Sequence, residues 1–518
     1  MSESCGNPNF ESEALMSRRP KYDKTKICVR CKLAMGSVVI RHVVYCKPCF
    51  GPMVATKFRR TLEPHINVTP DAGPRRKALK APGSLLLGFS GGLGSVVLLD
   101  LVNRSYFPPS NSTGDASSEQ TKSGNGIGLR DEKAERRGGK DHPRNLRVWD
   151  KGSVCYVEIC GAFPGMRDRT EEMRDLVNSN FPQLEFISAR LEDAFDDAWW
   201  NAVGGKLVDG AFRVDVSSEE LHLSAMSGEA TPADRLQKYI SLLPTQTAIP
   251  SAIQDLTRLI LLHTALYRNA SHLLLGTSLT SLSVSLISSI SQGGGFNVRE
   301  EAQEEWIPPD SRSRPSQIPI RIIRPLRDVG LKECAMWAWW NGLHIPGREK
   351  HPGGKQGVGA LTYNFITGLE RDFPSTVSAI ARTCAKLEPK QVSESHCILC
   401  QRPAQPGIQD WKERISIRSF IDSSIIPPPH VSRDGIFAKE KSDSGDLPSP
   451  GLTPLLCYAC HTTLTSRSPR GTARNADMAS PLPSWVNSRL SDSIATTRKM
   501  GEGAMRDSIR DFLLEEDP

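Results

Sequence analysis

Short apolar runs, separated by polar or glycine-rich turns, recur along the chain. The clearest is Leu85–Phe89, which is long enough for one buried parallel strand, and the apolar stretch Val96–Val102 that follows predicts a helix. Further strand-like runs lie at 154–159, 184–188, 272–275 and 318–325, with helical patterns such as 254–270 and 327–343 between them. Strands that alternate with helices in this way predict an α/β fold built on a doubly wound parallel sheet.

Between Phe89 and Val96 the sequence reads Ser90-Gly91-Gly92-Leu93-Gly94-Ser95. A glycine-rich turn between a strand and a helix N-terminus can hold a phosphate, because free backbone N–H groups and the helix dipole point at the ligand. The candidate ligand-binding residues are Ser90, Gly91, Gly92 and Ser95. The alternative is an ordinary strand–helix turn that uses glycine for its geometry.

Eight of the thirteen cysteines form four CxxC pairs. The first two pairs are Cys28/Cys31 and Cys46/Cys49, and the last two are Cys397/Cys400 and Cys457/Cys460. The N-terminus has no apolar core of a secretory signal, so we expect a cytoplasmic location, where thiols stay reduced and paired cysteines favour zinc over disulfides. Each set of four is a predicted tetrahedral zinc site, the second interrupted by a long Pro/Ser-rich insertion. The alternative is unligated cysteines in the core.

Positive charge is concentrated near the N-terminus. Residues 17–80 hold 16 Lys and Arg against three acidic residues, whereas the whole chain carries +7. Cations interleaved with Tyr22, Tyr45, Phe50 and Phe58 suit an RNA-binding face, and a solvated basic surface is the alternative. The candidate RNA-binding residues are Lys57, Arg59, Arg60, Arg75, Arg76 and Lys77.

No apolar run is long enough to span a membrane. The patterns together predict the domain organisation of the chain. We expect disorder at 1–20, a basic zinc ribbon at 21–60, a basic linker at 61–83, the α/β core at 84–345 with insertions at about 104–150 and 292–316, a helical linker at 346–395, the second four-cysteine module with a disordered insertion at 396–462, a loop at 463–500 and a C-terminal helix at 501–518. Within the core, 199–250 is expected to be a loop-rich excursion with short helices.

The combination of motifs resembles a known family. The SGGLGS loop is similar to the PP-loop of the ATP pyrophosphatase superfamily, whose usual form is Ser-Gly-Gly-x-Asp-Ser. With the paired CxxC motifs, the segment KFRRTLEP at 57–64 and the segment RPLRD at 324–328, the chain resembles the cytoplasmic tRNA thiolation proteins, and among them the more divergent of two paralogous subunits.

The resemblance implies a subunit of a complex that 2-thiolates wobble uridine 34 in the tRNAs for Lys, Glu and Gln. The partners it implies are tRNA, the paralogous catalytic subunit in a heterodimer, and a ubiquitin-like carrier whose thiocarboxylate supplies the sulfur; modification of proteins by that carrier is a further implication. ATP with Mg²⁺ would activate the uridine oxygen as an adenylate. The resemblance leaves two alternatives open: this chain binds ATP, or only its paralogue does.

Two departures from the family pattern bear on catalysis. Gly94 stands where the PP-loop has Asp, and Gly276-Thr277-Ser278-Leu279-Thr280 has neither the His nor the carboxylates of the paralogue's segment. We therefore assign no catalytic residue and expect a structural, tRNA-binding subunit. Two alternatives stay open: an adenylating tRNA thiolase in its own right, and a zinc-dependent RNA-binding scaffold with a vestigial core.

Two further groups are expected to be structural. Cys155, Cys160 and Cys334 match no sulfur-relay motif and are interpreted as buried thiols. The cluster Trp337, Trp339 and Trp340 is interpreted as a packing surface rather than a ligand cage.

Overall fold

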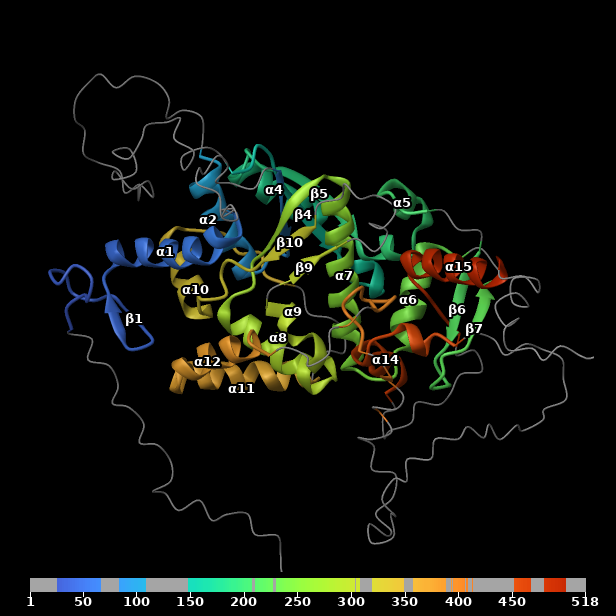
Figure 1. Ribbon diagram of the computed structural model, residues 1–518. Helices are drawn as coiled ribbons and strands as arrows, with labels where there is room; N and C mark the ends of the chain where they lie inside the picture. The colour runs from blue at the N-terminus through green and yellow to red at the C-terminus, as the bar shows by residue number, and fades with distance from the viewer. Residues whose placement is uncertain are drawn as a thin grey trace, which may run out of the picture.

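A computed structural model of the chain describes residues 26–66, 83–108, 148–206, 210–226, 230–302, 304–307, 319–348, 357–387, 393, 395–405, 407, 408, 412, 451–466 and 479–499 (Figure 1). The expectations for 1–20 and 501–518, and most of the expected insertion at 104–150, lie outside the described residues. Within these described ranges, no helix is both long enough and apolar enough to cross a bilayer.

The core is a six-stranded sheet with the strand order β5-β4-β3-β8-β10-β9. All neighbouring pairs are parallel except β9 with β10. The strands are β3 (Ser84–Phe89), β4 (Gly152–Glu158), β5 (Glu185–Arg190), β8 (Ala270–Leu275), β9 (Glu304–Trp306) and β10 (Ile320–Ile323). The chain moves outward from β3 to β4 and β5, then returns to the other side of β3 at β8. The carboxyl ends of β3 and β8 thus flank a topological switch point, where doubly wound folds hold their ligands.

Both faces of this sheet are covered, which confirms the doubly wound fold. Leu85, Leu87 and Phe89 face one side, where they pack with α1 (Lys47–Ile66), α2 (Leu93–Tyr106), α4 (Thr170–Asn180) and α10 (Leu331–Trp340). Leu86 faces the other side, which is covered by α6 (Pro232–Leu242), α7 (Ala248–Tyr267) and the second set of cysteines. The near-continuous apolar character of β3 follows from burial on both faces.

A smaller helical layer lies below the sheet in Figure 1. It contains α8 (Leu279–Ser291), α9 (Val298–Ala302), α11 (Val358–Asp372) and α12 (Pro374–Cys384), and its small core includes Leu286, Ile366 and Val377. The residues expected to form a polar insertion at 292–316 supply α9 and the edge strand β9. β9 pairs with β10, Trp306 is buried in the core, and the buried Glu304 pairs with Arg258 of α7.

Three segments are more ordered than the sequence predicts. The loop-rich excursion at 199–250 contains β6 (Ala211–Asp215) and β7 (Leu223–Met226) besides α6, and α5 (Asp197–Ala202) runs into its start. The expected loop at 463–500 contains β11 (Ala479–Pro481) and α15 (Ser484–Lys499), and β11 completes a three-stranded sheet in the order β11-β6-β7. The expected boundary at residue 60 falls inside α1, which continues to Ile66.

The remaining elements are short. The N-terminal ribbon is the hairpin of β1 (Val38–Ile40) and β2 (Val43–Tyr45), which leads directly into α1. The described part of the chain also contains four short 3₁₀ helices, which follow β4, follow β5, precede α9 and precede Cys457. In chain order these are η2 (Cys160–Ala162), η3 (Leu191–Phe195), η4 (Gly294–Asn297) and η6 (Thr453–Leu455), and the helix α14 (Tyr458–Thr465) begins directly after Cys457.

Candidate nucleotide loop and metal sites

The structure brings the four predicted loop residues together at the carboxyl end of β3. Gly91 has a φ of 68°, a left-handed conformation that favours glycine. The Ser95 hydroxyl donates to the carbonyl of Gly92 at 2.8 Å and lies 3.3 Å from the Ser90 hydroxyl. No side chain caps the N-terminus of α2. The loop thus has the geometry of an anion-binding turn at the switch point of the sheet.

A second segment crosses this loop, and we call residues 346–348 the strap. The Gly347 N–H donates to the carbonyl of Gly91 at 3.0 Å, and the Arg348 guanidinium donates to the Ser90 hydroxyl from Nε at 3.2 Å and from Nη2 at 3.0 Å. Arg169 holds the strap from the other side, since its Nη1 donates to the carbonyl of Gly347 at 3.0 Å. The Ser90 hydroxyl, a predicted phosphate ligand, is therefore already engaged by a side chain of the protein.

Gly94 is held against the turn that follows β8. A Cβ atom placed on Gly94 would lie 2.0 Å from the carbonyl oxygen of Gly276, and a Cβ on Gly276 would lie 2.5 Å from the backbone nitrogen of Ser95. The obstacle in both directions is backbone, which cannot rotate out of the way. The departure from the PP-loop pattern at position 94 is thus also a packing requirement, because no residue with a side chain fits there without movement of the main chain.

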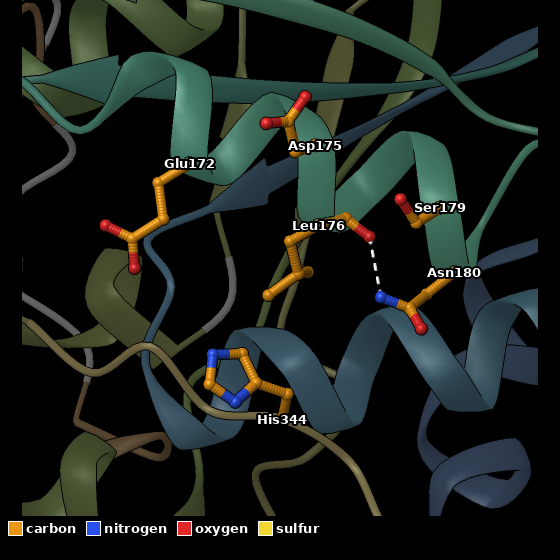
Figure 2. Close-up of a pocket in the computed structure, with 6 residues that line it drawn as sticks. All are labelled: Glu172, Asp175, Leu176, Ser179, Asn180 and His344. Carbon is orange, nitrogen blue, oxygen red and sulfur yellow. Dashed lines mark hydrogen bonds between the residues drawn. The ribbon is translucent and has the colours of Figure 1, made fainter.

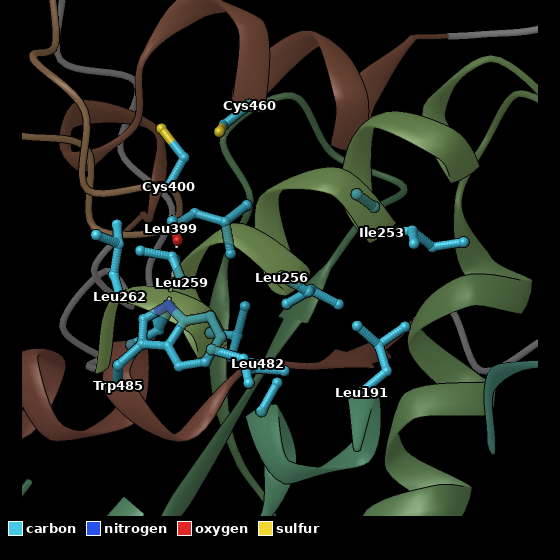
Figure 3. Close-up of a cluster of buried hydrophobic side chains, with 14 of the residues drawn as sticks. Leu191, Ile253, Leu256, Leu259, Leu262, Leu399, Cys400, Cys460, Leu482 and Trp485 are labelled. Atoms are coloured by element: carbon cyan, nitrogen blue, oxygen red, sulfur yellow. Dashed lines mark hydrogen bonds between the residues drawn. The ribbon is translucent and has the colours of Figure 1, made fainter. Parts of the chain in front are cut away.

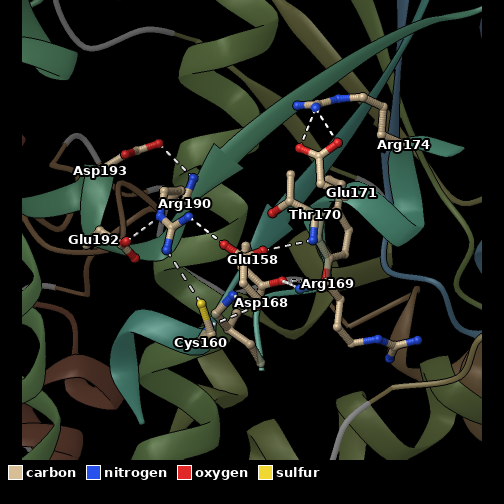
Figure 4. A network of polar contacts seen from close by, with 12 residues as sticks. Glu158, Cys160, Asp168, Arg169, Thr170, Glu171, Arg174, Arg190, Glu192 and Asp193 are labelled. Atoms are coloured by element: carbon tan, nitrogen blue, oxygen red, sulfur yellow. Dashed lines mark hydrogen bonds and ion pairs between the residues drawn. The ribbon is translucent and has the colours of Figure 1, made fainter. Parts of the chain in front are cut away.

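Carboxylates do lie near the loop, at the ends of β4 and β5 (Figure 4). Glu158 is 2% exposed, and its carboxylate accepts N–H groups from Ile159 at 2.7 Å, Cys160 at 3.0 Å and Arg169 at 2.8 Å. Hydrogen bonds from Thr170 and the ion pair with Arg190 lower the pKa of Asp168 to about 2. Both acidic groups are engaged by hydrogen bonds within the loops. The place of Glu158 at the end of a buried strand was its only signal in the sequence, and Asp168 has no such signal.

The three cysteines interpreted as buried thiols differ in exposure. Cys155 and Cys334 are fully buried, and burial raises the pKa of the Cys155 thiol to about 12 and that of Cys334 further. Cys160 is only partly buried and accepts a long hydrogen bond of 3.5 Å from Arg190 Nη2. Burial disfavours the thiolate, so Cys155 and Cys334 are unreactive core residues.

A shallow pocket of about 280 Å³ opens along α4 (Figure 2). It is lined by Glu172, Asp175, Leu176, Ser179, Asn180 and His344. All but His344 come from one helix, and none is a predicted site residue.

The first four cysteines converge at the base of the N-terminal ribbon. The sulfur atoms of Cys28, Cys31, Cys46 and Cys49 all lie within 4.8 Å of one another, and those of Cys31 and Cys46 are 3.8 Å apart. Four thiolates about 2.3 Å from one tetrahedral ion are separated by about 3.8 Å. This first cluster could therefore hold a metal ion, and Cys31 and Cys49 leave it partly open to solvent.

The second four cysteines converge although 56 residues separate the two pairs in the sequence. The sulfur atoms of Cys397, Cys400, Cys457 and Cys460 also lie within 4.8 Å of one another, and those of Cys400 and Cys457 are 3.7 Å apart. All four are buried in the largest apolar cluster of the protein, beside Trp485 (Figure 3). This second cluster could hold a metal ion too, with a donor set that fits one tetrahedral ion equally well.

The second cluster is tied to the core by hydrogen bonds to its own backbone. Arg258 on α7 donates to the carbonyl of Cys400 at 2.9 Å, and the Trp485 indole on α15 donates to the carbonyl of Leu399 at 3.1 Å. Arg258 also pairs with Glu304 on β9. The sequence could not reveal these links, because they join positions 46, 86 and 142 residues apart.

The predicted RNA-binding cations fall into two groups. Arg75, Arg76 and Lys77 lie outside the described residues. Lys57, Arg59 and Arg60 lie on α1, where Lys57 pairs with the buried carboxylate of Glu333 and Arg60 is exposed.

Of the four aromatic residues in that prediction, Tyr22 lies outside the described residues and Tyr45 is partly exposed, but base stacking by Phe50 and Phe58 is wrong. Phe50 is 1% exposed and Phe58 is fully buried, so neither can stack on a base. Both belong to the face of α1 that packs on the sheet, together with Val54 and Leu62.

Comparisons with known proteins support the family resemblance. A family model described as cytoplasmic tRNA 2-thiolation protein 2 matches residues 357–462. Proteins named cytoplasmic tRNA 2-thiolation protein 2 are 26% identical over 531 residues in Xenopus tropicalis (95% of each chain), 23% identical over 550 residues in Danio rerio (95% of this chain, 94% of the relative) and 23% identical over 563 residues in Homo sapiens (96% and 95%).

A solved structure, the U34-tRNA thiolase NcsA from Methanococcus maripaludis with its [4Fe-4S] cluster, is similar with 14% identity and a TM-score of 0.42, over 70% of this chain and 90% of that one. The sequence relatives extend over nearly the whole chain, whereas the family model covers α11, α12 and the second cysteine cluster. The sequence relatives thus confirm the predicted resemblance: along nearly its full length, this chain resembles the cytoplasmic tRNA 2-thiolation protein 2 family.

Proposed function

We propose that the chain is a cytoplasmic subunit of a tRNA sulfurtransferase that 2-thiolates wobble uridine 34 in the tRNAs for Lys, Glu and Gln. Its paralogue, in a heterodimer, adenylates the uridine, and a thiocarboxylated ubiquitin-like carrier supplies the sulfur. This chain contributes tRNA binding and a structural scaffold. The names of relatives that match 95% of its length support the pathway.

The division of labour rests on the backbone contact between Gly94 and Gly276. An adenylating PP-loop needs room for an acidic side chain at position 94, and the carbonyl oxygen of Gly276 occupies that space. The Arg348 guanidinium also satisfies the Ser90 hydroxyl that a phosphate would otherwise contact. Both features favour a loop that is kept for its shape rather than for nucleotide chemistry.

The cysteine clusters support structural metal sites, which we propose to hold zinc. Sulfur separations of 3.7 and 3.8 Å match one tetrahedral ion, whereas an iron–sulfur cubane spreads its thiolates over separate iron atoms. When bound, zinc would supply four bonds that join distant chain segments and no reactive open position. The chain's own contribution is to pre-position the thiols, in the first cluster from the ribbon and in the second from the core.

The basic ribbon supports tRNA as the partner. Residues 26–49 contain five Lys and Arg and not one Asp or Glu. Three of these cations, Arg30, Lys32 and Lys47, have exposed side chains next to the first cluster. A surface with cations and no compensating carboxylates attracts the phosphate backbone.

The test is tRNA-dependent ATP pyrophosphatase activity, measured with the zinc-loaded chain alone, with the paralogue alone and with both. We expect activity only when the paralogue is present, and no loss when Ser90→Ala and Ser95→Ala are combined in this chain. The equivalent serine changes in the paralogue's own loop are the matched control and should abolish turnover. Turnover by this chain alone that is lost in the double variant would identify the chain as an adenylating enzyme. Failure of the chain to bind the paralogue would instead favour a zinc-dependent RNA-binding scaffold.

A further inference from the structure

The three tryptophans near the end of α10 have different surroundings. Trp337 is 1% exposed, and its indole N–H donates to Asp100 at 2.8 Å, so it is a core residue as expected. Trp340 is partly buried. Trp339, by contrast, is 73% exposed, which makes it a large flat ring presented to solvent.

This exposed ring adjoins the N-terminal ribbon through a chain of contacts. The rings of Trp339 and Trp340 are nearly parallel, with centroids 6.4 Å apart and an interplanar angle of 26°. Trp340 meets the edge of Phe50 at 4.9 Å and 89°. Phe50 directly follows Cys49, whose carbonyl accepts a hydrogen bond from Arg30 Nη1 at 3.4 Å. The ring of Trp339 is thus linked, through Trp340 and Phe50, to the chain segment that carries the first cysteine cluster.

Two further contacts fix α10 against the ribbon and α1. Lys332 Nζ donates to the carbonyl of Val39 in β1 at 2.8 Å, and Glu333 pairs with Lys57 on α1. Figure 1 shows α10 directly below α1 and beside the β1 hairpin. These contacts fix α10, and with it the backbone of Trp339, against the ribbon before any ligand arrives, which lowers the entropic cost of binding.

We propose that Trp339 is a stacking platform for an unpaired base of RNA bound across the ribbon. The proposal rests on the proposed function, since it names a contact within the tRNA-binding surface. Stacking on an exposed ring beside phosphate-binding cations is how proteins hold single-stranded nucleic acid. Duplex RNA hides its base faces, so the ring selects the unpaired loop of an RNA hairpin over its stem. Residues 26–49 contain no Asp or Glu, so this surface favours the phosphates of RNA over a protein partner that would bind through its own basic residues.

The experiment measures binding of a fluorescein-labelled RNA hairpin with an unpaired loop to the full-length, zinc-loaded chain by fluorescence anisotropy. Trp339→Ala should weaken binding roughly tenfold or more, and Trp339→Phe should restore most of it because a flat ring is kept. Tyr267→Ala removes an exposed ring of the α7 terminus (59% exposed) and should leave affinity unchanged. The salt dependence should be the same in all variants, because no charge is removed.

Each remaining outcome decides against one of the two proposals. If the wild-type chain binds the hairpin and Trp339→Ala binds equally well, the stacking role is wrong and the proposed function is untouched. If Trp339→Ala keeps RNA binding but loses the paralogue, the ring docks a protein and the stacking role is also wrong. If the wild-type chain binds no RNA, alone or with the paralogue, tRNA binding itself is refuted. A duplex without a loop should not distinguish Trp339→Ala from the wild type.

Discussion

Restoring the missing PP-loop carboxylate by Gly94→Asp should damage the protein rather than activate it. The new Cβ would lie 2.0 Å from the carbonyl oxygen of Gly276, whereas ordinary contacts of this kind begin at 3.4 Å, so the two backbones must separate by about 1.4 Å. Overpacking in a rigid core costs about 1–3 kcal/mol, and a clash with main chain belongs at the upper end of that range. For a chain of 518 residues, a loss of about 3 kcal/mol corresponds to a drop in Tm of roughly 3 °C.

The measurement is thermal unfolding of the zinc-loaded protein, compared across three variants. Gly94→Ala should lose as much stability as Gly94→Asp, because the clash begins at Cβ and not at the carboxylate. Gly368→Ala is the matched control: a Cβ there has open space on α11, and removal of a helical glycine adds roughly 0.5–1 kcal/mol. ATP turnover should not appear in Gly94→Asp. A variant with wild-type Tm that gains tRNA-dependent turnover would refute the steric reasoning and the assignment of a structural loop.

Three further predictions concern the core. Cys400→Ser should lower Tm by several °C, since the second cluster is fully buried. Cys31→Ser in the partly exposed first cluster should lower it far less, and scanning calorimetry with and without a chelator compares the two variants. Burial lowers the pKa of His272 to about 4, and the Trp149 indole donates to its Nδ1. The neutral ring therefore stabilises the fold above pH 6.5, and roughly 3 kcal/mol of that stability is lost as pH falls toward 4. In denaturant titrations, the free energy of unfolding of His272→Gln should depend less on pH than that of the wild type. Trp337→Phe removes a hydrogen bond to the buried Asp100 and should cost about 2 kcal/mol in urea unfolding, and an unchanged midpoint would contradict that contact.

The parts predicted well are those whose signal is local. Leu85, Leu86, Leu87 and Phe89, followed by a glycine-rich turn, predict β3 and the loop, because such a run is typical of a strand buried on both faces. The CxxC spacing likewise fixes each half of a thiolate site, so the eight cysteines could be assigned without knowledge of the fold. The loss of the acidic residue at 94 was visible as well, but the sequence could not show that Gly276 fills its place.

The parts missed depend on distant partners. β6 is short and pairs with β11, more than 260 residues later, so neither segment shows a strand pattern by itself. The helix α1 contains Pro52 and Pro64, which normally argue against a helix, but packing of Phe58 and Leu62 on the sheet outweighs that preference. The exposure of Trp339 was equally out of reach, because three neighbouring tryptophans look alike until the face of the helix is known.

The pairing of β6 with β11 has a consequence for synthesis of the protein. At roughly 5–20 residues per second, a ribosome needs on the order of 15–50 seconds to pass from Asp215 to Ala479. During that interval the β6–β7 hairpin has an open edge, and the apolar surface that later receives Trp485 is uncovered. The nascent chain is therefore expected to need a chaperone that shields this surface until β11 and α15 have left the ribosome.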